Sequence, residues 1–341
     1  MPKVSVDQLR KRLALMDEQR SAYERQAAQA NGLRRHEVWR HQYLAYPYLL
    51  GASDEMVEER FKSIFMNNVE LTKEGKISLV PLETTEEFMV AFTHLLEEYA
   101  ARVGGLPGDV VAKARGPIDK YFEQGSPPGV RMFEKYTTPS GPLLVKYGKR
   151  RFLEPMLSTG SIRISNAKFY SNSGFLDSIR DDETSRTFFF PTYRERLQEK
   201  RSILFKGHNI PIEDDDIALP FRFDDYYLLS LCTHVHHRMP TDFDADAAIV
   251  IKNPAVFVQR VIATFLARHS DWVPLEGPVI YYDPYRDYTK FTIPEMAKHI
   301  GYAYQKEFRI AFKPKQRVYT DLEPLMLSIG SMKDYADLVT L

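Results

Sequence analysis

The stretch Gln305-Lys306-Glu307-Phe308-Arg309-Ile310-Ala311-Phe312 carries the strongest structural signal in this chain. The alternating pattern over residues 308–312 predicts a β-strand. Side chains two apart in a strand point the same way, so Gln305 and Glu307 are expected side by side where the strand begins. A carboxylate among aromatic residues needs hydrogen-bonding partners if it is buried. Glu307 is therefore either a functional residue or a solvated residue at the start of an edge strand.

A second segment gives a complementary pattern upstream. Residues 143–145 are typical of a short buried strand, and Gly148 permits a tight departure from it. Apolar side chains recur at helical spacing over residues 152–157, and Gly160 is well placed as a left-handed helix cap. The predicted order is strand, glycine turn, short helix, glycine, and a further strand over residues 161–165.

These segments, taken in order, resemble the ADP-ribosyltransferase superfamily over roughly residues 134–341. Its first core strand ends in a His-Gly or Tyr-Gly-like pair, to which Tyr147-Gly148 is similar. Its last motif is a strand opened by the catalytic Glu, which resembles Glu307 and the residues after it. Residues 226–233 stand where that superfamily has a strand rich in Ser and Thr, although Ser230-Leu231-Cys232 departs from the usual Ser-Thr-Ser.

The resemblance implies cleavage of the bond between nicotinamide and ribose in NAD, the co-substrate, and transfer of ADP-ribose to an acceptor. Glu307 would stabilise the oxocarbenium-like ribose, and Gln305 would position an acceptor other than arginine. Tyr147 and Gly148 would contact the nicotinamide end of NAD, and Tyr170 would stack on the nicotinamide ring. The positive charges of Lys146, Arg150 and Arg151 would bind the pyrophosphate. The expected NAD-binding residues are Lys146, Tyr147, Gly148, Arg150, Arg151, Tyr170, Ser230 and Thr233.

Several of these residues also fit simpler structural roles. Tyr147 and Tyr170 are equally typical of core aromatic residues whose hydroxyl reaches water. Arg150 and Arg151 stand at a predicted helix start, where solvated cations are common. A non-catalytic binding protein that keeps an ADP-ribosyltransferase-like shell is a further alternative, in which Glu307 would tolerate substitution.

The main alternative is a zinc-dependent hydrolase or nuclease. Sulfur and imidazole ligands suit zinc, and a carboxylate from Asp181, Asp182 or Glu183 would complete four ligands. Ligands that alternate closely on one straight strand cannot all reach a single ion without a bend, so we expect no metal here. The histidines would then line a groove or contact a substrate. The candidate zinc ligands from this segment are Cys232, His234, His236 and His237.

Composition sets wider limits. With 341 residues, 44% of them apolar and 27% charged, the chain can form one large core or two smaller ones, and two domains are expected. The net charge is zero, so no overall field attracts nucleic acid or an anionic membrane. No stretch approaches the about 20 apolar residues of a membrane span, and the chain starts without an apolar signal region. Its single Cys232 excludes an internal disulfide, and we expect a cytoplasmic protein.

The chain divides most clearly at Gly125-Ser126-Pro127-Pro128-Gly129, because prolines between glycines interrupt both helix and strand. Residues 1–125 predict a mostly helical accessory domain, with caps at Ser5 and Ser53 and a hairpin over residues 69–80. A linker is expected over residues 126–141. Residues 142–341 predict an α+β domain with a split, mostly antiparallel β-sheet, which the resemblance also implies.

The basic run over residues 34–41 would suit a nucleic-acid backbone or a partner, although such runs more often form a solvated helix face. The helical domain is therefore expected to support the fold, guide a substrate, or bind a partner such as an antitoxin or regulatory protein. The resemblance further implies an intracellular toxin or defence effector. RNA, DNA, a protein side chain and water all stay open as the acceptor.

Overall fold

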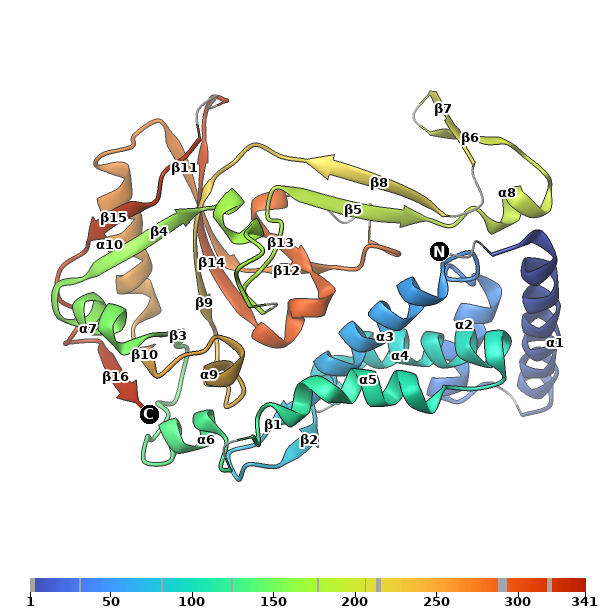
Figure 1. Ribbon diagram of the computed structural model, residues 1–341, viewed down its shortest axis with the longest axis horizontal. Coiled ribbons are helices and arrows are strands. Elements are labelled where there is room, and N and C mark those ends of the chain that lie inside the picture. Colours follow the sequence, from blue (N-terminus) through green and yellow to red (C-terminus); the bar gives the residue numbers. More distant parts are fainter. Residues whose placement is uncertain are drawn as a thin grey trace.

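A computed structural model describes residues 4–30, 32–80, 82–123, 125–176, 178–205, 207–212, 216–287, 293–317 and 321–341. Helices dominate the first part of the chain, and strands dominate the remainder (Figure 1). The predicted caps form: Ser5 N donates to Gln8 Oε1 at 2.8 Å, and Met56 N donates to Ser53 Oγ at 3.3 Å. The elements of the first part are α1 (Val6–Ala30), α2 (Arg35–Ala45), α3 (Asp54–Asn67), β1 (Val69–Leu71), β2 (Ile77–Leu79), α4 (Leu82–Val103) and α5 (Gly108–Asp119).

The second part contains a large sheet, several short two-stranded units and the helices that cover them. Its first elements are α6 (Pro128–Phe133), β3 (Leu144–Gly148), α7 (Arg150–Thr159), β4 (Ser161–Asn166), η1 (Ala167–Ser171), β5 (Ser185–Phe190), α8 (Tyr193–Leu197), β6 (Ser202–Phe205), β7 (His208–Pro211), β8 (Ile217–Arg222) and β9 (Tyr227–Cys232). They are followed by α9 (Met239–Asp242), β10 (Ala247–Ile251), α10 (Pro254–Leu266), β11 (Trp272–Pro278), β12 (Ile280–Tyr282), η2 (Pro294–Met296), β13 (Ala297–His299), η3 (Ile300–Gln305), β14 (Glu307–Pro314), β15 (Leu325–Ser328) and β16 (Ala336–Thr340).

The large sheet has eight strands, with β11-β14-β9-β3-β10-β16 in order and β4 joining β9 to β15. Its strand pairs are antiparallel, whereas the small β12–β13 pair is parallel. The protein is therefore α+β with a mostly antiparallel sheet, as the sequence predicts. In the register, Glu307 lies opposite Cys232 and Arg309 lies opposite Ser230. β14 lies between β11 and β9, so the edge-strand interpretation of Glu307 is wrong.

The two faces of the sheet differ in character. Phe308, Ile310 and Phe312 alternate along β14 and pack with α7 and α10 in the largest apolar core. The Phe312 and Phe265 rings stack with centroids 3.7 Å apart. Glu307 and Arg309 point to the opposite face, where the candidate site lies.

Gly160 ends α7 in the left-handed conformation, with φ 71°, as its position in the sequence predicts. A Cβ there would lie 2.2 Å from the Gly330 carbonyl oxygen, so a larger residue does not fit. The short helix and its glycine bring the chain back to β4, which runs alongside β9.

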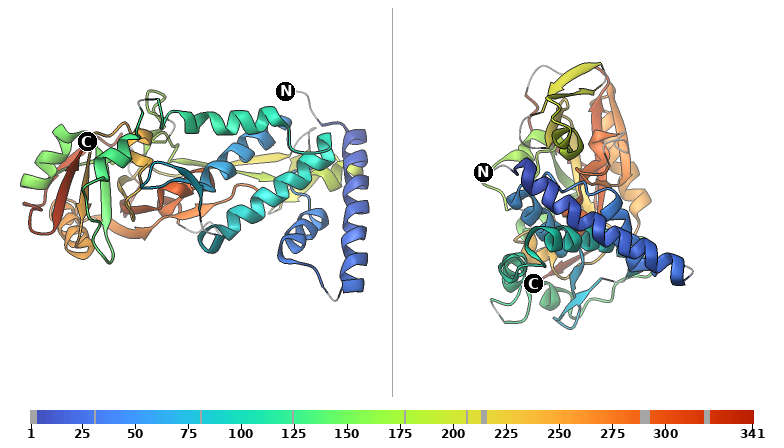
Figure 2. Two further views of the ribbon diagram at one scale, coloured as in Figure 1. Left: turned by 90° about the horizontal axis from the view of Figure 1, so that it is seen from below. Right: turned by 90° about the vertical axis from the view of Figure 1, so that its right-hand side faces the viewer.

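The two parts of the chain share an extensive contact, and Figure 2 shows the helices beside the sheet along the long axis. Arg60 of α3 donates to Asp283 at 2.8 and 2.6 Å, with both side chains buried. The segment expected to be a linker forms α6, where a Cβ on Gly129 would lie 1.8 Å from the His237 carbonyl oxygen. The domain boundaries given by the sequence therefore stay a prediction.

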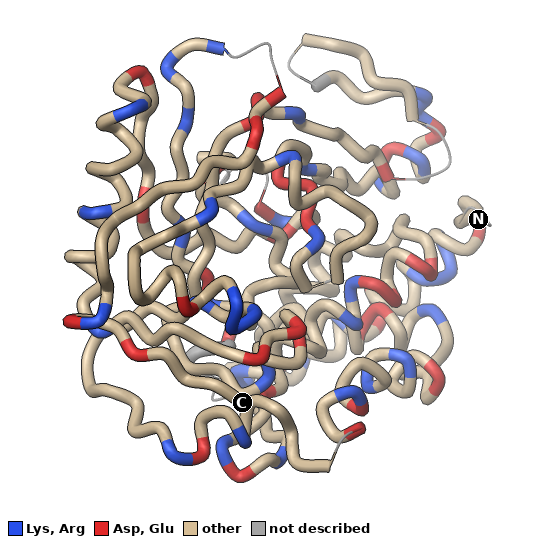
Figure 3. The backbone as a smooth tube through the Cα atoms, turned by 60° about the vertical axis from the view of Figure 1, so that its left-hand side comes forward, with Lys and Arg blue, Asp and Glu red and all other residues tan. Residues whose placement is uncertain are grey.

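Basic and acidic residues are interspersed over both parts (Figure 3). In the run over residues 34–41, Arg34 pairs with Glu37 at 2.6 Å and Arg35 with Glu86 at 2.7 Å. Arg40 lies 3.3 Å from a Glu97 carboxylate oxygen. Acidic neighbours thus accompany these cations, which is typical of a solvated helix face. None of the helices in the described part of the chain is long and apolar enough to cross a membrane.

Candidate functional site

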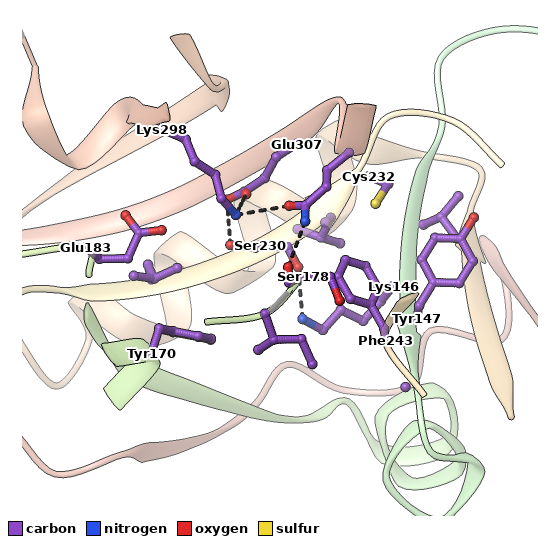
Figure 4. A pocket seen from close by; sticks show the side chains of 16 residues that line it. Lys146, Tyr147, Tyr170, Ser178, Glu183, Ser230, Cys232, Phe243, Lys298 and Glu307 are labelled. Carbon is purple, nitrogen blue, oxygen red and sulfur yellow. Dashed lines mark hydrogen bonds and ion pairs between the residues drawn. The ribbon is translucent and has the colours of Figure 1, made fainter. Parts of the chain in front are cut away.

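A cavity of about 220 Å³ opens on the sheet face where β3, β9 and β14 are neighbours (Figure 4). It brings together residues from all the predicted motifs, which lie up to about 160 positions apart in the chain. The cavity is lined by Val145, Lys146, Tyr147, Gly148, Tyr170, Ser178, Ile179, Glu183, Leu228, Ser230, Leu231, Cys232, Phe243, Lys298, Gln305 and Glu307.

Glu307 is a hydrogen-bonded carboxylate of this cavity wall and is only 3% exposed. Its Oε1 accepts from Ser230 Oγ at 2.6 Å and Arg309 Nε at 2.8 Å. Its Oε2 accepts from Lys298 Nζ at 2.7 Å. Burial opposes ionisation, but Arg309 and Lys298 outweigh it and hold the pKa of Glu307 well below its usual value. Glu307 is therefore a carboxylate throughout the neutral range.

Gln305 lies beside Glu307, as predicted, but strand alternation is not the reason. Gln305 ends η3, and Lys306 adopts a left-handed conformation with φ 43° before β14 begins. Lys298 connects the two side chains, since its Nζ also donates to Gln305 Oε1 at 3.0 Å. Gln305 Nε2 donates to the Ser178 carbonyl at 2.7 Å. Both ends of the Gln305 amide are thus engaged within the protein.

A buried ion-pair network supports Glu307 from behind. Arg309 Nη1 and Nη2 donate to the Glu183 carboxylate at 2.9 and 2.8 Å, and Arg186 Nη2 donates to it at 2.7 Å. The Tyr226 hydroxyl lies 3.2 Å from the same carboxylate. Burial opposes the ionisation of Glu183, but Arg309 and Arg186 lower its pKa. Arg309 therefore joins two carboxylates and fixes the distance between Glu183 and Glu307.

The first motif contributes one wall of the cavity. Lys146 Nζ donates to the Ser230 carbonyl at 2.9 Å, and burial lowers the pKa of this lysine. The Tyr147 hydroxyl accepts from His236 N at 2.8 Å, so this tyrosine also anchors the chain after β9. Tyr170 lines the cavity, and its burial raises the pKa of the phenol to about 12.

Three of the predicted NAD-binding residues do not line this cavity. Arg150 pairs with Glu154 at 2.6 Å on the exposed face of α7. The Arg151 guanidinium lies 4.8 Å from the Phe152 ring centroid. Thr233 Oγ1 donates to the Lys306 carbonyl at 3.0 Å, so it supports the turn before Glu307. The predicted NAD-binding residues that do line it are Lys146, Tyr147, Gly148, Tyr170 and Ser230, together with the predicted catalytic residues Gln305 and Glu307.

The cysteine and histidines do not form a metal centre. Within the described ranges, no three His, Cys, Asp or Glu side chains are grouped so that they could share an ion. Cys232 is buried at the cavity wall, where burial raises the pKa of its thiol to about 12. His237 instead packs edge-on against Phe133, and Glu183 bonds to arginines. The geometry therefore does not match the zinc-site hypothesis.

The sequence did not predict Lys298 or Ser178 as site residues, and it predicted Glu183 only as a possible zinc ligand. Lys298 is on β13, a short strand outside the large sheet, and Ser178 and Glu183 lie in irregular chain before β5. No periodic pattern or motif marks these positions. The alternation of Glu307 and Arg309 was the one available signal, since it places an arginine on the same strand face as the carboxylate.

No protein-family model matches the chain, and no curated protein or solved structure matches it either.

Proposed function

We propose that this protein is an ADP-ribosyltransferase that moves ADP-ribose from NAD to a macromolecular acceptor. One observation carries the proposal: Glu307, Ser230 and Tyr147-Gly148 come from separate motifs and lie around one cavity on neighbouring strands. The resemblance in sequence requires such a meeting, whereas a chance match of short motifs does not. The ionised, immobilised Glu307 adds chemical support.

Glu307 would act through its charge. In the reaction the bond between C1′ of ribose and the nicotinamide nitrogen breaks, and its electron pair leaves with nicotinamide. The ribose becomes oxocarbenium-like, and a carboxylate beside it stabilises the developing positive charge. The acceptor then forms a bond to C1′ and loses its proton to water, because the lowered pKa of Glu307 makes it a poor base.

The oxygens of Glu307 have different roles in this proposal. Oε1 is occupied by Ser230 and Arg309, whereas Oε2 accepts only from Lys298 among the bonds described. A carboxylate oxygen accepts two hydrogen bonds. Oε2 therefore has room for a ribose hydroxyl, and the ribose would sit between Glu307 and the wall formed by Tyr147 and Gly148.

The size of the cavity fits one end of NAD. Clefts that bury a drug-sized ligand usually have about 300–1,000 Å³. The cavity of about 220 Å³ would accept the nicotinamide ribose end, with Tyr170 at its wall, and leave the adenosine end outside. Lys146 is a partly buried cation on this wall, and the pyrophosphate would bring it a close charged partner.

The acceptor would be a nucleic acid or a protein side chain other than arginine, in line with a Gln at position 305. Gln305 would then have to exchange its bond to Lys298 or Ser178 for one to the acceptor. A cytoplasmic toxin or defence effector controlled by an antitoxin or regulatory protein on the helical part fits this proposal. The family resemblance alone suggests such a biological role.

The proposal is tested by incubating the intact chain with NAD labelled in its adenylate phosphate, together with RNA, DNA and protein fractions. We expect label to enter one fraction as ADP-ribose in step with nicotinamide release. Binding of NAD without nicotinamide release would support the non-catalytic shell instead. The proposal would be refuted if the chain neither binds NAD nor releases nicotinamide with any of these fractions.

A further inference from the structure

The segment that delivers Glu307 to the cavity is η3 with the turn after it. Gln305 ends η3, and Lys306 is a non-glycine residue in the left-handed region, with φ 43°. Such a conformation is sparsely populated unless its surroundings impose it. The positions of Gln305 and Glu307 therefore depend on what holds η3.

The helical part of the chain holds η3 through Asn67, the last residue of α3. Asn67 Oδ1 accepts from Tyr304 N at 2.6 Å. Its Nδ2 donates to the carbonyls of Ile300 at 3.1 Å and Gly301 at 3.3 Å, and also to Ser63 O at 2.7 Å. The side chain is buried, with 4% exposure. One amide from the first part of the chain thus binds both ends of η3.

Arg238 attaches the same segment to the same end of α3. Its Nη1 donates to the carbonyls of Met66 at 3.0 Å and Val69 at 3.3 Å. Its guanidinium carbon lies 3.9 Å from the centroid of the Tyr304 ring. Tyr304 is therefore bound at its backbone by Asn67 and at its ring by Arg238, one residue before Gln305.

We propose that Asn67 is a positioning residue for the Glu307 site and acts through η3. The site is then completed by the helical part of the chain, which is more than an attached accessory module. The inference rests on the proposed function for its effect on catalysis. The link between Asn67 and residues 300–307 has a readout of its own.

Asn68 provides a matched control. It is the next residue, has the same side chain and is similarly buried, with 6% exposure. Its Nδ2 donates to Ile64 O at 3.0 Å, within the first part of the chain. Asn67→Ala and Asn68→Ala thus remove the same group at similar depth. Asn67→Asp is the conservative variant, because it keeps the acceptor for Tyr304 N but places an oxygen against the Ile300 and Gly301 carbonyls.

The full-length variants are compared by NAD turnover and by hydrogen exchange of the backbone amides over residues 300–307. We expect Asn67→Ala to lower kcat about a hundredfold with KM little changed, the effect of a small misplacement of catalytic groups. Exchange at Tyr304 should accelerate in Asn67→Ala, accelerate less in Asn67→Asp, and stay unchanged in Asn68→Ala.

Equal effects of Asn67→Ala and Asn68→Ala on kcat and exchange would overturn the inference, as would unchanged exchange over residues 300–307 in Asn67→Ala. A protein that turns over no NAD would refute the proposed function. In that case the exchange comparison would still decide whether Asn67 fixes the segment that carries Glu307.

Discussion

Lys298 and Lys146 line the same cavity. Exchanging each for Met compares the loss of a lysine that forms an ion pair with the loss of a lysine that forms none at close range. Lys298 lies 2.7 Å from Glu307 Oε2, whereas Lys146 donates to a backbone carbonyl and forms no ion-pair contact among the described residues, although the charge of Glu307 acts on it at longer range. Lys298→Met leaves a buried carboxylate with one ion-pair partner fewer. Lys146→Met removes a partly buried cation whose pKa is lowered by desolvation.

The magnitude follows from the remaining contacts of Glu307. Removing one member of a buried pair typically costs about 3–5 kcal/mol. Arg309 and Ser230 still bond to Oε1 in Lys298→Met, so we expect the lower end, about 3 kcal/mol of unfolding free energy. Lys146→Met is expected to be neutral or stabilising, because it replaces a partly buried cation that has no close ion-pair contact with an apolar chain of similar length.

Urea unfolding of both full-length variants at pH 7, followed by circular dichroism, measures the difference. The reasoning predicts that Lys298→Met is less stable than Lys146→Met by about 3 kcal/mol. Equal stability of the two variants would show that the contact between Lys298 and Glu307 contributes nothing net. A Lys146→Met variant less stable than the parent chain would show that the ammonium of Lys146 makes a net stabilising interaction.

Three further predictions concern other parts of the molecule. Burial raises the pKa of Asp181 to about 7 from 3.8, so the folded state holds a proton that the unfolded state has lost, and the unfolding free energy falls as pH rises between these two pKa values. Asp181→Asn should flatten the fall in unfolding free energy from pH 4 to pH 8, and an unchanged pH profile would contradict this. Gly160→Ala should lower thermal stability by about 2 kcal/mol or more, since both its φ and the nearby Gly330 oxygen exclude a Cβ, and a variant as stable as the parent in calorimetry would refute the clash. Arg60→Met should lower the unfolding free energy by about 3–5 kcal/mol, because it leaves Asp283 buried without its arginine. In the parent chain the helical part and the sheet-containing part should unfold together, and separate transitions in near- and far-ultraviolet dichroism would show that the contact does not couple them.

The sequence predicts local features of this fold well, because local rules decide them. The caps at Ser5 and Ser53 and the left-handed Gly160 depend on residues a few positions away. The strands expected over residues 143–145, 161–165, 226–233 and 308–312 have continuous apolar or alternating patterns and appear as β3, β4, β9 and β14. Strands β5 and β8 were not predicted, because they pair with each other as a ribbon outside the large sheet and have only partly buried faces.

The candidate site was only partly predictable for the same physical reason. Glu307, Gln305, Ser230 and Tyr147 stand in patterned segments, so their types and order in the sequence were informative. Lys298 reaches Glu307 from a strand of three residues, and Asn67 reaches η3 from a helix more than 230 positions earlier. Such contacts depend on the packing of distant segments, which composition and periodicity do not encode.

The rate of nicotinamide release from NAD by the intact chain and by Glu307→Gln tests the central claim most directly. We expect turnover by the intact chain and a fall of about 10²–10³-fold in kcat for Glu307→Gln, because the variant lacks the charge that stabilises the ribose cation. Ser230→Ala, which removes one hydrogen bond and keeps that charge, should fall between the two, and circular dichroism should show that each variant is folded. Turnover by a folded Glu307→Gln at the rate of the intact chain would contradict the assignment of Glu307 as the catalytic carboxylate.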